Sequence, residues 1–114
     1  MSERAWFDGL PAAITVCDEN GTVLEMNDRA AETYKNEGGR ALVGTNLRAC
    51  HPPAACAKLE ALLEKREANA YTIRKRGVRK LIYQSPWYRD GNYAGIVELS
   101  LPIPDDIPEF IRQE

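Results

Sequence analysis

The sequence has no long apolar run and no strong excess of charge of either sign. No stretch approaches the ~18 consecutive apolar residues that a membrane-spanning helix needs, and the opening Met1-Ser2-Glu3-Arg4 lacks the basic-then-apolar pattern of a signal peptide. The formal net charge of −2 provides no basic field for nonspecific binding of nucleic acid or anionic lipid. We therefore expect a cytoplasmic protein that binds neither nucleic acid nor membrane.

Histidine and cysteine, which carry much metal and nucleophilic chemistry, are scarce. The chain has one histidine, and it lacks a Ser-His-Asp spacing, a glycine-rich phosphate loop and a metalloprotease motif. Its three cysteines are an odd set in a chain without an export signal, so we interpret them as free thiols rather than a disulfide framework. The sequence thus predicts a protein that is not an enzyme, in a reducing compartment.

The length and composition are typical of a single compact domain. A chain of 114 residues with 44% hydrophobic content is in the ordinary range for one core. We predict an N-terminal segment or cap over residues 1–10, one folded domain over 11–103 and a C-terminal tail over 104–114. Acidic residues after Pro104 favour one or two further helical turns in that tail.

Alternating and β-branched apolar residues predict strands in both halves of the chain. Turn-prone residues separate the first two strands at 18–21 and the last three at 76–78 and 90–92. The last three should therefore form an antiparallel meander. The expected strands cover residues 13–17, 22–26, 70–75, 80–88 and 94–103.

Helical signals lie between the second and third strands. A short helix should begin at Asn27 or Asp28 and end before Gly38. After a mixed stretch from Arg40 to Pro53, small or apolar residues recur three to four residues apart and predict a longer helix with one buried face. This order predicts an α+β fold, a five-stranded antiparallel sheet with helices packed on one face.

The expected strand over 80–88 has apolar residues on both faces. Strand alternation places together Leu81, Tyr83, Ser85 and Trp87. A sheet with an apolar outer face usually buries that face against something. Trp6, Phe7 and Leu10 are the candidates for such a cover.

The first turn and the start of the short helix carry a particular set of residues, namely Asp18, Gly21, Val23, Asn27, Ala30 and Ala31. Together with the order of elements, these residues resemble the PAS family of sensory domains. The family's opening pattern is an acidic residue and a glycine in a hairpin, a branched residue, and an asparagine followed by small residues. Residues 42–47 resemble the segment that closes over the family's pocket, and residues 90–98 resemble its last hairpin. The resemblance spans residues 6–103.

The resemblance implies a fold that cups a cavity between sheet and helical cap, used to sense small molecules, cofactors, redox state or partner domains. It also implies a dimer contact through the outer sheet face and the N-terminal segment. Flavin-binding light sensors of the family carry an Asn-Cys-Arg-Phe type motif, which does not occur from Asn46 to Cys50, so we expect no flavin photoadduct. The run Cys50-His51-Pro52-Pro53 is similar to a segment seen in a subset of the family.

Cys50, His51 and Cys56 form the sharpest local cluster of reactive residues. They lie within seven residues near the start of the longer helix, where thiolate and imidazole could meet at one point. A closed zinc site would need a further ligand, which Cys17 would have to supply from a distant strand. His51 or Cys50 could instead hold haem iron. In the simplest alternative, Cys56 is a small buried helix residue and His51 shapes the loop.

The ligand-binding residues that we predict are Cys50, His51, Cys56, Tyr34 and Trp87. We predict a sensory module that binds a small-molecule ligand or a signalling partner and passes the change on through homodimer or partner contacts. Two alternatives stay open: a haem- or metal-linked redox sensor that uses the Cys50, His51 and Cys56 cluster, and a ligand-free protein interaction module. The sequence does not identify a cofactor.

The redox-sensor alternative predicts a bound group that can be seen directly. If Cys50 or His51 holds haem or a metal, freshly purified protein should show a Soret band or a stoichiometric metal, which Cys50→Ala or His51→Ala should remove. An absorption spectrum with elemental analysis makes the measurement. Colourless, metal-free protein would contradict this alternative and leave the organic-ligand sensor and the interaction module.

Overall fold

A computed structural model of the protein describes residues 4–50 and 53–113. It contains one antiparallel sheet with the strand order β2-β1-β5-β4-β3. The predicted α+β fold with a five-stranded antiparallel sheet is confirmed, and so is the meander of the last three strands. The strands are β1 (Ala13–Asp18), β2 (Val23–Met26), β3 (Asn69–Lys75), β4 (Val78–Arg89) and β5 (Asn92–Ile103).

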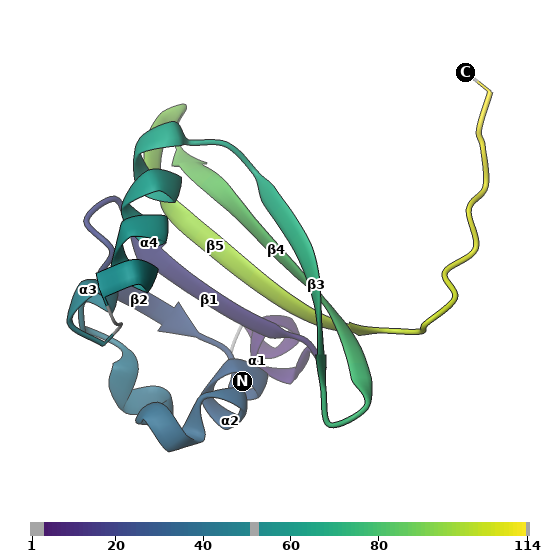
Figure 1. The fold of residues 1–114 in the computed structure, drawn as a ribbon. Coiled ribbons are helices and arrows are strands. Elements are labelled where there is room, and N and C mark those ends of the chain that lie inside the picture. Colours follow the sequence, from purple (N-terminus) through teal and green to yellow (C-terminus); the bar gives the residue numbers. More distant parts are fainter. Residues whose placement is uncertain (1–3, 51–52, 114) are drawn as a thin grey trace.

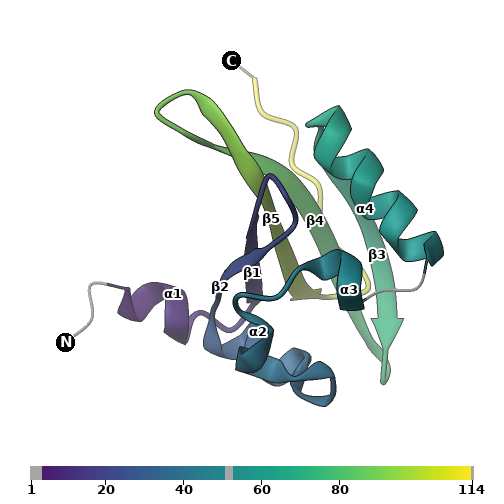
Figure 2. The ribbon, with the colours of Figure 1, turned by 90° about the vertical axis from the view of Figure 1, so that its left-hand side faces the viewer.

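Helical segments between β2 and β3 cover one face of the sheet (Figure 1). Figure 2 shows the first helix, α1, on the opposite side of the strands from α4. Within the described residues, no helix is long and apolar enough to cross a membrane. The segments are α1 (Ala5–Gly9), α2 (Asp28–Thr33), α3 (Leu47–Cys50), α4 (Pro53–Lys65) and two 3-10 helices, η1 (Lys35–Glu37) and η2 (Gly39–Leu42).

Two tight turns hold the meander in register. Arg76 and Gly77 connect β3 to β4, and Asp90 and Gly91 connect β4 to β5, all with φ between 52° and 82°. Two consecutive residues with positive φ form the turn whose twist matches that of the flanking antiparallel strands. Because each connection needs only two residues, β4 begins at Val78, earlier than the sequence pattern predicts.

Asn27 is a fully buried polar residue at the junction of α1, β1 and α2. Its side-chain oxygen accepts hydrogen bonds from the backbone amides of Ile14 and Ala30, both at 3.0 Å. Its side-chain nitrogen donates to the backbone carbonyl oxygens of Phe7 and Ala12, at 3.0 and 2.8 Å. One side chain therefore caps α2 and ties it to the chain before and within β1.

The apolar core beneath the helices is divided into two clusters. Leu47 of α3 packs against both clusters, and Leu59 and Leu62 of α4 pack against the second. The first cluster consists of Ala13, Val23, Met26 and Ala30, and the second of Cys17, Leu63 and Ile96. The helical cap thus contacts the sheet at two places rather than through one continuous core.

The N-terminal segment forms a helix that covers little of the outer sheet face. Phe7 is buried, whereas Trp6 is 68% exposed and Leu10 is 39% exposed. Many apolar side chains on the outer face, opposite to α4, are therefore only half-buried or are exposed. They include Val16, Leu81, Tyr83, Val97, Leu99 and Leu101.

The C-terminal tail differs from the prediction. Residues 104–113 contain no helix, and Figure 1 shows this segment leading away from the sheet. Phe110 and Ile111 are 71% and 88% exposed, so almost no packing supports them. A helix this short needs tertiary packing to be stable, and Pro108 cannot donate a backbone hydrogen bond. The prediction of further helical turns here is wrong.

The buried hydrogen bonds of Asn27 predict a large loss of stability on substitution. Asn27→Ala should lower the free energy of unfolding by about 3 kcal/mol or more, because it leaves buried backbone groups without partners. Urea denaturation followed by circular dichroism makes the measurement. Asn36→Ala, at an exposed position of η1, is the matched control and should change stability by less than about 0.5 kcal/mol. Equal effects of the two substitutions would contradict this role of Asn27.

Candidate functional site

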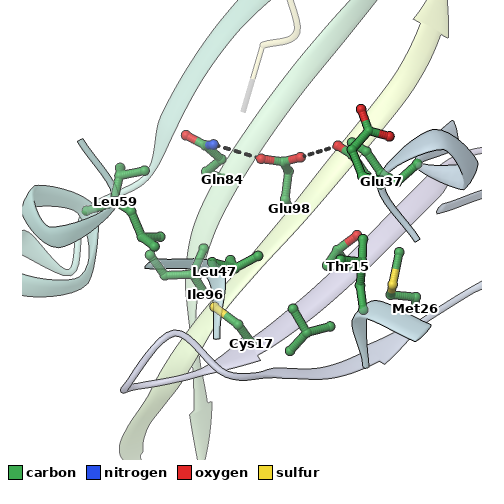
Figure 3. Close-up of a pocket in the computed structure, with 13 residues that line it drawn as sticks. Thr15, Cys17, Met26, Glu37, Leu47, Leu59, Gln84, Ile96 and Glu98 are labelled. Carbon is green, nitrogen blue, oxygen red and sulfur yellow. Dashed lines mark hydrogen bonds between the residues drawn. The ribbon is translucent and has the colours of Figure 1, made fainter. Parts of the chain in front are cut away.

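A cavity of about 620 Å³ lies between the sheet and the helical cap (Figure 3). This volume falls within the roughly 300–1,000 Å³ of small-molecule sites. Apolar side chains form most of its wall, with Val23, Met26 and Ile96 from the sheet and Leu42, Leu47, Leu59 and Leu62 from the cap. Mainly apolar walls with a few polar groups are typical of a site that binds an organic molecule.

Strand register brings the polar wall residues together. Thr15 and Cys17 of β1 lie opposite Glu98 and Ile96 of β5, and Gln84 of β4 lies opposite Glu98 on its other side. Because side chains alternate along a strand, all five point to the sheet face that the helices cover. Glu98 is thus placed on the central strand of the sheet, at the floor of the cavity.

Both carboxylate oxygens of Glu98 accept hydrogen bonds from other residues of the cavity wall. The Tyr34 hydroxyl donates to one oxygen at 2.9 Å, and the side-chain amide of Gln84 donates to the other at 2.8 Å (Figure 3). Burial, and then the neighbouring Glu98 carboxylate, raise the pKa of Tyr34 well above its usual range. Tyr34 therefore keeps its proton at neutral pH and acts as a donor.

The cavity adjoins a second hollow between α4 and β3. Leu59, Gln84 and Glu98 line both spaces, and Tyr71 of β3 lines the second. Tyr71 is 46% exposed, so this side of the cap is open. The adjoining hollow provides a route by which a small molecule could reach the cavity.

Sequence reasoning singled out Tyr34 but missed Glu98 and Gln84. Tyr34 lines the cavity at the C-terminal end of α2. A signal for Glu98 was present, because it shares a strand face with the apolar Ile96 and the buried Ser100. An acidic residue in that position is unusual for a covered face and indicates a specific partner.

Trp87 does not line the cavity. Its indole nitrogen donates to the backbone carbonyl oxygen of Cys17 at 3.0 Å, across β5. Gly95 lies opposite Trp87 on β5, and a Cβ at Gly95 would lie 2.0 Å from that same carbonyl oxygen. Trp87 and Gly95 therefore pack closely against β1 where its pairing with β5 ends. Strand alternation alone does not predict this contact.

Of the predicted Cys50, His51 and Cys56 cluster, the structure describes only the side chain of Cys56. The Cys56 thiol donates to the backbone carbonyl oxygen of Arg48 at 3.1 Å and so joins α4 to α3. His51 and the side chain of Cys50 lie outside the described residues. Over 4–50 and 53–113, no group of three or more His, Cys, Asp or Glu side chains could hold a metal ion. The cluster stays a prediction.

Cys17 lies in the cavity wall and is 3% exposed. Burial raises the pKa of its thiol, so its thiolate fraction at a given pH is lower than in the unfolded chain. In a Cys50→Ala/Cys56→Ala variant, native Cys17 should react with iodoacetamide at least about tenfold more slowly at pH 8 than in urea. Its rate should continue to rise above pH 9. Fast native alkylation at pH 7 would contradict this prediction.

Comparison with known proteins supports the same interpretation of the fold. The family model described as PAS fold matches residues 7–103. No curated protein sequence matches the chain. The PAS domain of BvgS from Bordetella pertussis is 23% identical, with a TM-score of 0.64 over 90% of this chain and 84% of that one. These comparisons show a shared fold.

Two further solved structures are similar. A C-terminal domain from Streptococcus mutans is 21% identical, with a TM-score of 0.70 over 83% of this chain and 78% of that one. The Aer2 receptor of Vibrio cholerae, a dual PAS-heme oxygen sensor, is 13% identical, with a TM-score of 0.60 over 82% of this chain and 95% of that one. Since the family match covers most of the 114 residues and the fold agrees, the chain belongs to the PAS fold family, whose domains are in general sensory, non-enzymatic modules.

Proposed function

We propose that this PAS domain senses a small organic ligand held in the cavity and passes the change on through homodimer or partner contacts. The observation that carries the proposal is the cavity of about 620 Å³, with mainly apolar walls and one hydrogen-bonded carboxylate on its floor. A purely structural interior would be filled by side chains, since protein cores are close-packed. The division of the core into two clusters leaves room for a ligand instead.

Two features support a relay from the cavity to the surface. Leu59 and Leu62 of α4 form part of the wall, so a ligand that binds one position of α4 more tightly would shift the population of that position. At the far edge of the sheet, Arg74 and Arg79 donate to the side chain and backbone carbonyl of Asp105, at 2.6 and 2.9 Å. The start of the tail is thereby attached to the β3–β4 hairpin.

The outer sheet face is the surface that we assign to a second copy of the chain. Its side chains are apolar and half-buried or exposed across β1, β5 and β4, as at Val16, Leu99 and Tyr83. Helix α1, which contains the exposed Trp6, lies on the same side of the sheet (Figure 2). A self-complementary apolar patch of this kind is suited to a two-fold symmetric dimer.

The haem- or metal-linked alternative rests on residues outside the described part. The described wall contains no histidine, and its cysteine is the buried Cys17. Membership of the subset with a Cys-His-Pro-Pro segment likewise stays a prediction. The absorption spectrum described above separates this alternative from an organic-ligand sensor.

Filling the cavity tests the proposal. Leu62→Trp should remove binding of compounds found by a thermal-shift library screen, because the larger ring occupies the cavity. Glu64→Trp, at an exposed position of the same helix, should bind them as the native protein does. Sedimentation with and without a bound compound then measures the shift in dimer dissociation, which requires different affinities for the two states.

Three results would contradict the proposal. If the screen finds no compound, or if Leu62→Trp leaves binding intact, the cavity is not a ligand site and the ligand-free interaction module is favoured. If a compound binds in the cavity but leaves dimerisation unchanged, the relay through a dimer fails while ligand binding stands.

A further inference from the structure

We infer that the cavity selects an apolar molecule that carries a protonated amine, and that Glu98 is the residue that recognises the amine. This inference rests on the proposed function and narrows it to one chemical class of ligand. It starts from the charge of the wall, the hydrogen-bonding capacity of the Glu98 carboxylate, and the position of the apolar surface beside that carboxylate.

The described wall of the cavity carries negative charge without a basic side chain. Glu98 and Glu37 are its ionisable acids, and no lysine, arginine or histidine is among its described residues. Lys58 and Lys65 line the adjoining hollow, and in the described structure neither forms an ion pair with Glu98. The charge of Glu98 is therefore left for a ligand to balance.

The Glu98 carboxylate is held in place but is not saturated. Tyr34 and Gln84 each donate one hydrogen bond, one to each oxygen, whereas an ionised carboxylate offers about four acceptor positions. Both donors are neutral groups, so they fix the orientation of the carboxylate without neutralising it. An ammonium group would supply donors and the opposite charge, and such charge-assisted bonds are among the strongest in proteins.

The apolar part of the ligand has a defined place next to this carboxylate. Figure 3 shows Leu47, Leu59 and Ile96 together on one side of Glu98. An aromatic or alicyclic body would pack against these side chains while its amine reaches Glu98. An anionic ligand of the same shape would meet the Glu98 carboxylate and bind more weakly, because like charges repel.

Matched sets of small compounds test this inference. Each set keeps one apolar body and changes only the polar end: tryptamine, tryptophol and indole-3-propionate, and likewise 1-naphthylmethylamine, 1-naphthalenemethanol and 1-naphthylacetate. Titration at pH 7 with detection by nitrogen-15 chemical shifts should show the amine bound about tenfold or more tighter than the alcohol, with the acid weakest. The shifts should cluster at wall residues such as Ile96, and Leu62→Trp should abolish them.

Two substitutions assign the selectivity. Glu98→Gln keeps the shape of the side chain but removes its charge, and it should bring amine and alcohol to similar affinity. Glu64→Gln is the matched control at an exposed position of α4 that does not line the cavity, and it should retain the preference. If Glu98→Gln fails to fold, Tyr34→Phe serves instead, because it removes one donor from the carboxylate and should strengthen amine binding.

The outcomes separate this inference from the proposed function. The role of Glu98 is overturned by any one of three results, each of which leaves a ligand-binding cavity. These are equal binding of amines and alcohols to the native protein, an amine preference that persists in Glu98→Gln, and weaker amine binding in Tyr34→Phe. The absence of cavity shifts with every probe at millimolar concentration overturns the inference. Only the additional failure of the library screen also removes the proposed function.

Discussion

The four hydrogen bonds of the buried Asn27 side chain are the constraint on which the helical half of the domain depends. They join the backbone of Phe7, Ala12, Ile14 and Ala30, so α1, the entry to β1 and the start of α2 meet at one amide group. Such a network is favourable only when every member is satisfied, because a buried amide without partners is costly. The asparagine side chain has two N–H donors and a carbonyl oxygen that can accept two hydrogen bonds, so it can form all four.

The same constraint positions the cavity. Because Asn27 caps α2, the helix begins at Asp28 and ends next to Tyr34, whose hydroxyl then reaches Glu98 on the central strand. The sheet contributes Glu98 and Gln84 through strand register, and the cap contributes Tyr34. A polar cluster assembled from three elements therefore links the position of the cap to the interior that a ligand would occupy.

The differences between prediction and structure have a common cause. The tail was predicted to be helical from its acidic start, yet it has no surface against which Phe110 and Ile111 could pack. Trp87 was predicted to bind a ligand because it is aromatic, and this stays a prediction, but its indole donates to the carbonyl of Cys17 outside the cavity wall. In both cases a local property was correct, but the outcome depended on neighbours distant in the sequence.

The sequence by itself determined the strands, the two turns at Gly77 and Gly91, a helix start at Asn27 or Asp28, and the family resemblance. Alternation, positive φ and helix capping are local effects, so a single sequence records them. Only the tertiary structure decided that Tyr34, Gln84 and Glu98 meet, and that residues of both core clusters line one cavity. Tyr34 and Glu98 are 64 positions apart, so their contact depends on the register of the strands and on how the helical cap packs on the sheet. No local sequence pattern contains either of these.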